Sequence, residues 1–338
     1  MARRHAPPPV WIREDRLPTL EEVTWLTSPE GRSTTTEMQE SPADTPAAIA
    51  RWRQRLSADQ VAAAWQQVQL RRAARSKFTR AAEMLFDRVA LEQASDEVVA
   101  AHKARRFAGI SRVADLCCGI GGDALALARV CPVVALDWSA VRLEMTRHNV
   151  AVYGGTVETV RGDASFDRPE AEAVHVDPDR RAEGPRRHDL ASGSPSLEEL
   201  GRIVAHYGQA AIKVSPGADF STLPFDAEVE LISHRGECRQ AVLWTGSLQQ
   251  AYRRAAILPE GVSLSAGRGD DLSWPEPRAP RAGDVLLEPD ASVIRADLVG
   301  VLARRLGAAP VDPQIAHLVS DRAETGGLAT AFRVVDVA

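Results

Sequence analysis

The sequence contains no run of apolar residues that approaches the ~18 needed to cross a membrane. The basic start of the chain is not followed by an apolar segment, so we expect no secretory signal. Cysteine is scarce, and the four present, Cys117, Cys118, Cys131 and Cys238, do not have the spacing of a metal site. We therefore expect a reduced, cytoplasmic protein with no disulfide framework, no bound metal and no membrane segment.

The sequence also lacks an excess of positive charge. Its 41 basic and 46 acidic residues give a formal net charge of −5, which excludes a global basic field that would attract nucleic acid. Contact with RNA or DNA would therefore need local basic patches. Only Lys77, Lys103 and Lys213 are lysines, so arginine supplies almost all of the positive charge, and its planar guanidinium can bind phosphate through two hydrogen bonds.

Composition divides the 338 residues into four regions. Residues 1–47 are rich in Pro, Ser, Thr and Glu, and stretches such as 28–36 indicate loop, so we expect a flexible N-terminal region. Residues 48–108 have the spacing of helices, and residues 109–250 alternate between strand and helix patterns. Residues 251–338 form a separate C-terminal region.

The helical region 48–108 has one clear start signal and one ambiguous basic stretch. Ser57-Ala-Asp-Gln60 predicts an N-cap for a helix that buries one apolar face. The members of that face are Val61, Ala64, Trp65 and Val68. The basic stretch from Arg71 to Arg80 is either a solvated helix side, which we favour, or a patch that binds substrate phosphate.

The region 109–250 predicts a doubly wound, largely parallel sheet. Strands are expected at 113–116, 133–136, 157–160, 173–176, 211–214, 228–232 and 241–244, and helices near 123–130, 139–152 and 196–207. The short polar connection before 241–244 predicts a terminal antiparallel hairpin. The expected fold is thus α/β with a seven-stranded sheet that ends in this hairpin, a layout that resembles Rossmann-like methyltransferases and differs from nicotinamide dehydrogenases.

The C-terminal region is expected to be a small α+β unit. Residues 257–264 could form a hairpin, residues 267–284 read as a linker, and residues 292–306 could form one helix. The final apolar run, which starts at Phe332, predicts a strand with no partner after it in the sequence.

The stretch Asp115-Leu-Cys-Cys-Gly-Ile-Gly-Gly-Asp123 is the most informative part of the chain. A buried strand, a glycine turn and a helix that begins with Asp123 as its N-cap would form a cradle for a nucleotide. The acid before the turn, Asp115, would repel a pyrophosphate, and it suits a cationic or hydroxyl-bearing ligand such as the amino end of S-adenosylmethionine. An ordinary tight turn is the alternative, because a lone pattern of Gly119, Gly121 and Ala124 is a weak signal.

Two further acids follow predicted strands. Asp137 lies about 20 residues beyond the glycine turn, where a carboxylate can accept both ribose hydroxyls, and Trp138 beside it could stack on adenine. Asp163 is placed to reach the adenine amino group, with the backbone of Ala164 nearby. The alternatives are a helix-capping Asp137 and a turn-forming Asp163. His148 and Asn149, in the intervening helix, are expected at the surface or the edge of the core.

Asp177-Pro178 follows the fourth predicted strand, at the edge of the sheet where open α/β sheets bind ligands. The Asp177 carboxylate could accept a hydrogen bond from an exocyclic amine and orient its lone pair toward a methyl group, so catalysis would be mainly positioning. The adjacent Arg180 and Arg181 could hold a phosphate or a carboxylate of the substrate, or they could belong to a solvated loop. Lys213 ends the fifth strand on the same edge and is either a site residue or a lysine reaching water.

Taken together, Asp115–Asp123 and Asp177–Arg181 resemble class I S-adenosylmethionine methyltransferases. The stronger resemblance is to bacterial methyltransferases with a C-terminal THUMP-like domain, which are similar to RNA cap guanine-N2 methyltransferases (trimethylguanosine synthases). It covers residues 50–250, with an echo at Glu288–Arg295. The supporting stretches are Lys77-Phe78, Leu91-Glu-Gln-Ala-Ser-Asp96, Lys213-Val-Ser-Pro-Gly217, Gly236-Glu237 and Ala241-Val-Leu-Trp244.

The resemblance implies a role for each matching residue. Cys118, Gly119 and Gly121 would hold the methionine part of the cofactor together with Asp115, and Asp137 would hold the ribose. Asp163 would bind the adenine. Gln93 and Ser95 would close over the cofactor from the preceding helix, and Asp177 and Pro178 would form the transfer site.

Two departures from the resemblance bear on the substrate. Pro178 is followed by Asp179 where cap and N6-adenine enzymes carry a second proline and an aromatic residue, so the aromatic platform for a target base is missing there. The THUMP-like region is expected to be partial, which bears on RNA binding.

The sequence thus predicts a cytoplasmic S-adenosylmethionine-dependent methyltransferase that acts on RNA, with guanine N2 as the candidate atom. Three alternatives stay open: a small-molecule methyltransferase, a non-catalytic RNA-binding protein on a methyltransferase fold, and an NAD-linked oxidoreductase that uses Gly119, Gly121, Ala124 and Asp137. The order and spacing of the residues show no Ser/His/Asp triad.

Overall fold

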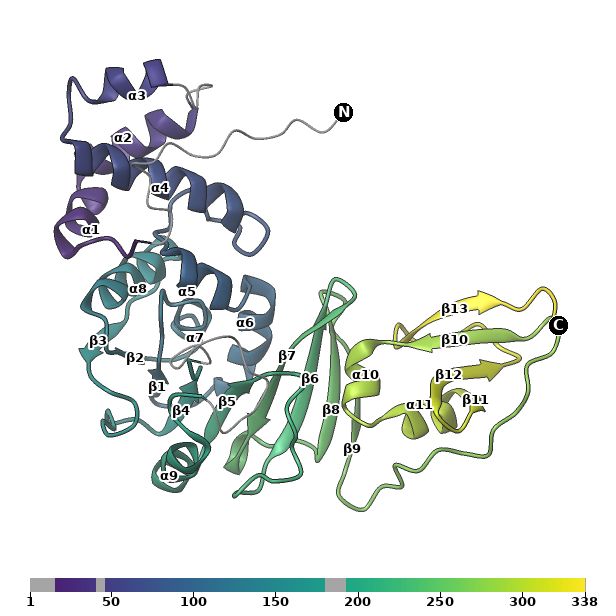
Figure 1. Ribbon diagram of the computed structural model, residues 1–338. Coiled ribbons are helices and arrows are strands. Elements are labelled where there is room, and N and C mark those ends of the chain that lie inside the picture. The colour runs from purple at the N-terminus through teal and green to yellow at the C-terminus, as the bar shows by residue number, and fades with distance from the viewer. Residues whose placement is uncertain (1–15, 41–45, 180–192, 338) are drawn as a thin grey trace. The chain divides into compact units, whose positions relative to one another are not determined.

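The structure is a computed structural model that describes residues 16–40, 46–179 and 193–337 (Figure 1). The chain divides into two compact units, Met1–Ala164 and Ser165–Ala338. None of the helices in the described ranges is long and apolar enough to cross a bilayer.

The first unit is mostly helical. Its helices are α1 (Leu20–Thr27), α2 (Pro29–Glu40), α3 (Pro46–Trp52), α4 (Ala58–Ala74), α5 (Arg88–Gln93), α6 (Glu97–Ala104), the 3-10 turn η1 (Arg105–Phe107), α7 (Ala124–Leu127) and α8 (Ala140–Val152). Helices α1, α2 and α4 pack against one another (Figure 1). The predicted start of α4 is confirmed, since Ser57 and Gln60 form a capping box and the whole predicted apolar face is buried.

The prediction that residues 28–36 form a loop is wrong, because they lie at the junction of α1 with α2 and within α2. Pro29 occupies the first position of the helix, where its missing N–H costs nothing, and the hydroxyl of Ser28 accepts a hydrogen bond from N of Gly31 (3.1 Å). Thr35 is buried and donates to O of Gly31 (2.7 Å). Tertiary packing of this face, with Met38 also buried, therefore overrides a composition typical of loops.

The basic stretch after α4 is only partly a solvated face. Arg71 is buried, and its guanidinium donates to O of Met84 (2.8 Å) and to Oε1 of Gln39 (2.8 Å). The ammonium of Lys77 donates to three carbonyl oxygens at the end of α5, those of Leu91, Glu92 and Ala94. These two cations therefore stabilise neighbouring backbone, whereas Arg72, Arg75 and Arg80 are exposed.

Three parallel strands complete the first unit, in the order β3–β2–β1. They are β1 (Val113–Leu116), β2 (Val133–Asp137) and β3 (Glu158–Arg161). Strands β1 and β2 are buried throughout, while the outer strand β3 is partly exposed. Because parallel strands run in one direction, the carboxyl ends of β1 and β2 meet at one edge of this sheet.

The second unit has a mixed sheet in the order β4–β5–β7–β6–β8–β9. Its strands are β4 (Ala173–Val176), β5 (Ala210–Val214), β6 (Glu228–His234), β7 (Glu237–Trp244), β8 (Arg253–Leu258) and β9 (Val262–Ala266). Helix α9 (Leu197–Tyr207) lies between β4 and β5 in the chain, and the short η3 (Gly246–Leu248) follows β7. Strand β7 pairs antiparallel with both β5 and β6, which confirms the predicted hairpin.

All seven predicted strands are present, but the sheet of the second unit does not end with the β6–β7 hairpin. Strand β8 pairs in parallel with β6, and β9 pairs antiparallel with β8. The predicted 257–264 hairpin is therefore longer than expected and belongs to this sheet. The physical reason is that β6 would otherwise expose a row of unpaired backbone groups at its outer side, which β8 satisfies.

A second sheet of four strands lies at the end of the chain, in the order β11–β12–β10–β13. Its strands are β10 (Val285–Pro289), β11 (Ala309–Asp312), β12 (Ile315–Ser320) and β13 (Ala329–Arg333). The expected single helix at 292–306 is instead two, α10 (Ala291–Arg295) and α11 (Val299–Leu306), because Asp297 has a φ of 62° and interrupts it. The final strand, β13, pairs antiparallel with β10, which precedes it in the sequence.

Candidate functional site

The loop after β1, residues 117–122, depends on residues with positive φ. Cys117 (φ 59°), Gly119 (58°) and Gly121 (81°) adopt this conformation, which glycine enters without the steric cost of a Cβ atom. A Cβ at Gly121 would lie 3.0 Å from Cγ2 of Thr146, so the loop is tightly packed there. A Cβ at Gly119 would meet nothing within 4 Å. The loop therefore has one packed side and one open side.

Helix α8 holds this loop through buried polar side chains. The hydroxyl of Thr146 donates to O of Gly119 (2.8 Å), and the amide of Asn149 donates to O of Ile120 (2.9 Å). Asn149 also donates to O of Leu85 and accepts from its N–H. The expectation that Asn149 lies at the surface or core edge is wrong, since it is fully buried and links three segments.

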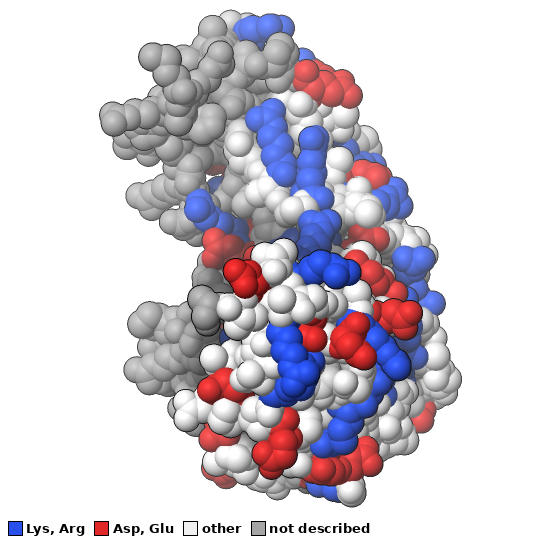
Figure 2. All heavy atoms as spheres, turned by 90° about the vertical axis from the view of Figure 1, so that its right-hand side faces the viewer, with Lys and Arg blue, Asp and Glu red and all other residues white. Residues whose placement is uncertain are grey.

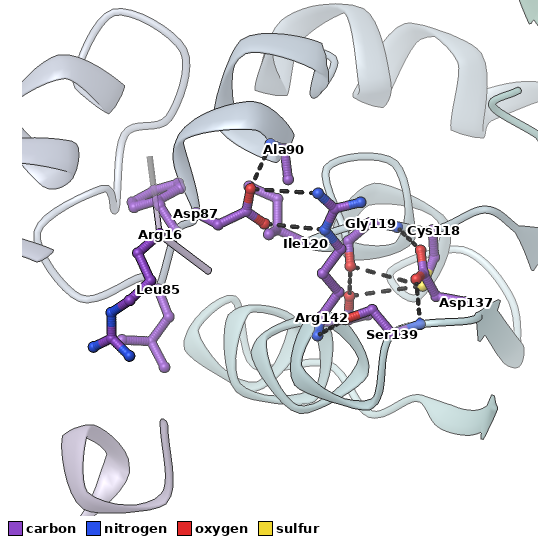
Figure 3. Close-up of polar contacts among 12 residues, drawn as sticks. Arg16, Leu85, Asp87, Ala90, Cys118, Gly119, Ile120, Asp137, Ser139 and Arg142 are labelled. Atoms are coloured by element: carbon purple, nitrogen blue, oxygen red, sulfur yellow. Dashed lines mark hydrogen bonds and ion pairs between the residues drawn. The ribbon is translucent and has the colours of Figure 1, made fainter. Parts of the chain in front are cut away.

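Asp137 is the last residue of β2 and is 4% exposed. Its Oδ2 accepts from N of Gly119 (3.0 Å) and its Oδ1 accepts from N of Ser139 (2.9 Å) (Figure 3). Burial raises the pKa of the carboxyl, whereas these two hydrogen bonds and Arg142 lower it. A carboxylate accepts about four hydrogen bonds in total, so ionised Asp137 has capacity for two hydroxyl donors.

Asp115 and Asp137 both lie near the thiol of Cys118. Burial, then Asp137, then Asp115 raise the pKa of this thiol well above its usual value. The parallel pairing of β1 with β2 explains this placement, because Asp115 is in register with Ala135 and both strands end at the same edge. The structure thus brings two predicted site carboxylates together around the glycine loop.

Of the predicted adenine contacts, Trp138 follows Asp137 in the chain, and Asp163 and Ala164 come shortly after β3, the strand paired with β2. Trp138 is 66% exposed, and its carbonyl accepts from Nε of Arg161 (3.1 Å). The N–H of Gly162 donates to O of Asp137 (3.2 Å), which holds the segment leading to Asp163 beside β2. Asp163 is exposed and Ala164 is buried.

A buried ionic cluster joins the end of α5 to the start of α7. The hydroxyl of Ser95 donates to Oδ2 of Asp123 (2.9 Å), and Nζ of Lys103 lies 3.1 Å from Ser95 Oγ and 2.7 Å from Asp123 Oδ1. Lys77 fixes the same end of α5, which carries Gln93. The sequence signals for Ser95 and Gln93 therefore located a segment adjacent to the glycine loop.

The prediction that Asp123 is a side-chain N-cap is wrong. Its backbone lies in the helical region (φ −93°, ψ −38°) and its side chain makes no capping hydrogen bond. A capping side chain needs the extended backbone of a residue outside the helix. The carboxylate turns instead to Lys103.

A second buried ion pair lies close to Asp137 (Figure 3). Asp87 caps α5 by accepting from N of Ala90 (2.9 Å). Its two oxygens also accept from Arg142 of α8, with Nε to Oδ2 at 3.1 Å and Nη2 to Oδ1 at 3.4 Å. The sequence analysis did not identify Asp87, Arg142 or Lys103. For Lys103 the available signal was a charged residue within an otherwise apolar helix pattern, which can indicate a buried ion pair.

In the second unit, Asp177 and Lys213 form an ion pair. Nζ of Lys213 lies 2.6 Å from Oδ2 of Asp177. The side chain of Lys213 is 5% exposed and that of Asp177 is 23% exposed. Strand β4 pairs in parallel with β5, with Val176 opposite Ile212, so the following residues Asp177 and Lys213 meet at the carboxyl edge. Pro178 is buried beside Asp177. The predicted residues Arg180 and Arg181 lie outside the described residues.

Across the ranges that the structure describes, no group of three His, Cys, Asp or Glu side chains is arranged to hold a metal ion.

Comparison with known proteins identifies the family. An uncharacterized S-adenosylmethionine-dependent methyltransferase of Mycobacterium tuberculosis (strain H37Rv) is 38% identical over 247 residues, covering 71% of this chain and 67% of the relative. The chain belongs to the S-adenosylmethionine-dependent methyltransferases. The same values hold for the corresponding protein of M. tuberculosis strain CDC 1551.

The methyltransferase also matches two family profiles and one solved structure of similar extent. The RNA cap guanine-N2 methyltransferase profile matches residues 110–177, and a domain of unknown function (DUF8688) matches residues 19–74. A structure from Porphyromonas gingivalis W83, provisionally assigned as a methyltransferase, has a TM-score of 0.67 and 18% identity, covering 93% of this chain and 81% of that one. This likeness shows the mixed α/β fold of methyltransferases with a large central sheet.

The cofactor of this methyltransferase is S-adenosylmethionine, and the nicotinamide-linked alternative is thereby set aside. The first unit fits a nucleoside with hydroxyl groups. Next to the open side of the loop at Gly119, Asp137 has acceptor capacity for two hydroxyls, and Trp138 exposes an aromatic surface. Asp115, in the adjacent strand, supplies a second negative charge.

Proposed function

We propose that this methyltransferase methylates RNA, with the exocyclic N2 of guanine as the acceptor. The match of residues 110–177 to the RNA cap guanine-N2 methyltransferase profile carries this proposal, because that segment contains the glycine loop and ends at Asp177. The resemblance to THUMP-like-domain methyltransferases supports the same substrate class. On this proposal the C-terminal region contributes to RNA binding and the enzyme acts in the cytoplasm.

We assign the cofactor contacts to the first unit. Asp115, Cys118, Gly119 and Gly121 would hold the methionine part and Asp137 the ribose. Trp138, Asp163 and Ala164 would hold the adenine, and Gln93 and Ser95 would close the pocket from the end of α5. When bound, S-adenosylmethionine supplies a methyl group on a positively charged sulfur.

We assign the acceptor contacts to Asp177 and Pro178. Lys213 holds Oδ2 of Asp177 at 2.6 Å, so the carboxylate is fixed in one orientation and Oδ1 is the oxygen we assign to an amine N–H. That hydrogen bond would direct the nitrogen lone pair at the methyl carbon. In such a transfer a C–N bond would form as the C–S bond breaks, and the nitrogen would release one proton to water. Catalysis would depend mainly on this positioning.

The surface charge bears on how RNA would bind. On the face shown in Figure 2, basic and acidic side chains are interspersed, in keeping with the net charge of −5. RNA contact would therefore depend on local arginines, with Arg180 and Arg181 as candidates from the sequence.

The test is to incubate the purified protein with labelled S-adenosylmethionine and total RNA, with and without nuclease, and to identify the modified nucleoside. We expect label in nuclease-sensitive material as N2-methylguanosine. Asp177→Ala should lose at least about 100-fold in transfer rate, in line with the loss of a group that acts mainly in the transition state, while binding of S-adenosylhomocysteine stays unchanged. Glu198→Gln, an exposed acid on α9, is the matched control.

Label that enters only small molecules would favour a small-molecule methyltransferase. RNA binding without transfer would favour the non-catalytic alternative, for which the missing aromatic residue after Pro178 is the specific observation. An unchanged rate for Asp177→Ala would remove this residue from the mechanism.

A further inference from the structure

The ion pair between Asp87 and Arg142 lies within a continuous network that reaches Asp137. Arg142 is the third residue of α8, and its N–H donates to the hydroxyl of the cap residue Ser139 (3.4 Å). Ser139 in turn donates its own N–H to Asp137. The side chain of Arg142 is 15% exposed and that of Asp87 is 5% exposed, so the pair is mostly shielded from water. Figure 3 shows both groups beside the contacts of Gly119 with Asp137.

This pair joins two segments to which the proposed function gives separate roles, holding the ribose and closing the cofactor pocket. Asp87 caps the start of α5, whose last residue is Gln93, and Ser95 follows two residues later. Arg142 belongs to the turn that positions Asp137. A buried, two-point contact between arginine and carboxylate fixes direction as well as distance. We propose that the Asp87–Arg142 ion pair is a positioning pair that aligns Asp137 with α5 and sets the affinity of the enzyme for its cofactor. This inference rests on the assignment of Asp137 to the ribose.

The two partners act on Asp137 with opposite sign. Arg142 lowers the pKa of the Asp137 carboxyl and Asp87 raises it, on top of the larger upward effect of burial. Further titratable groups near Asp137 include the Cys118 thiol, whose raised pKa keeps it protonated, and Asp115, which also lies near that thiol. The pair therefore affects both the position of Asp137 and the charge around its carboxyl group.

The sign of the pH dependence follows directly. If Asp137 holds the ribose, its ionised carboxylate would accept hydrogen bonds from both hydroxyls, so cofactor binding should be present above its pKa and lost as the pH falls through it. Removing Arg142 should raise this pKa, and removing Asp87 should lower it. We call the pH below which cofactor binding is lost the acid limit. A purely structural role of the pair would weaken folding in both variants, and it would not move the acid limit in opposite directions.

The experiment measures the affinity for S-adenosylhomocysteine by calorimetry as the pH is lowered from neutral until binding is lost. Near the acid limit of the wild type, Arg142→Gln should bind about tenfold more weakly, and its own limit should lie at a higher pH. Asp87→Asn keeps an oxygen to cap α5 and should shift the limit downward. Arg142→Lys, which keeps the charge but not the two-point contact, should retain the wild-type limit. Arg147→Gln, an exposed arginine on the same helix that pairs with Glu144, is the control.

Limits that stay unchanged, or that move in the same direction in Arg142→Gln and Asp87→Asn, would overturn the inference. If Arg142→Gln does not fold, the comparison of Asp87→Asn with Arg142→Lys decides, because only the first should shift the limit. Asp137→Ala separates the two levels of the argument. Wild-type affinity in Asp137→Ala would overturn the proposed ribose site itself. If Asp137→Ala loses affinity but the acid limits of Arg142→Gln and Asp87→Asn do not move, only the positioning pair is refuted.

Discussion

Alanine substitution at Gly119 and Gly121 tests whether the glycine loop has one packed side and one open side. Both residues have positive φ, where an added Cβ costs about 1–2 kcal/mol. At Gly121 the new Cβ would also lie 3.0 Å from Thr146, and overpacking of this kind adds about 1–3 kcal/mol. At Gly119 the Cβ enters open space beside Asp137. Gly121→Ala should therefore lose more stability, whereas Gly119→Ala should lose more cofactor affinity.

Matched glycines isolate each effect. Gly154 has a φ of 78°, close to that of Gly121, and Gly307 has a φ of 61°, close to that of Gly119, yet a Cβ at either would meet nothing within 4 Å. By thermal unfolding, Gly121→Ala should be less stable than Gly154→Ala by the contact term of about 1–3 kcal/mol. By calorimetry with S-adenosylhomocysteine, Gly119→Ala should bind about tenfold more weakly, or 1.4 kcal/mol, and Gly307→Ala should bind normally.

Equal stability of Gly121→Ala and Gly154→Ala would show that Thr146 does not close that side of the loop. Wild-type affinity in Gly119→Ala would show that the ligand does not occupy the open side, and the assignment of this loop to the cofactor would then be wrong.

Two further predictions concern buried groups. Lys103→Met leaves the buried carboxylate of Asp123 without its cation and should destabilise the protein by about 3–5 kcal/mol, measured by thermal unfolding. The double variant with Asp123→Leu should recover part of this loss. A double variant that is no more stable than Lys103→Met would argue against the ion pair. Burial raises the pKa of Cys131 to about 11 and that of Cys238 to about 12, and it raises that of Cys118 as well, so these thiols should resist iodoacetamide at about pH 8 in the folded protein; peptide mass spectrometry that found Cys118 alkylated as fast as in the unfolded chain would contradict this.

Local patterns in the sequence determined much of this protein. All seven predicted strands are present, and α4 begins at its predicted cap. The glycine loop and the acids Asp115, within β1, and Asp137, at the end of β2, were singled out from local patterns, because strands, caps and tight turns follow from the chemistry of a few neighbouring residues.

Contacts between distant residues were decided only by the tertiary structure. Asp87 and Arg142 are 55 positions apart, and Ser95 and Asp123 are 28 apart, so no local pattern indicates their pairing. The helix α2 forms from a loop-like composition because packing against α1 and α4 buries one of its faces. Strand β8 joins β6 because an unpaired strand edge needs a partner. In each case the free energy comes from burial or pairing that exists only once the chain has folded, which is why these features could not be predicted from the sequence.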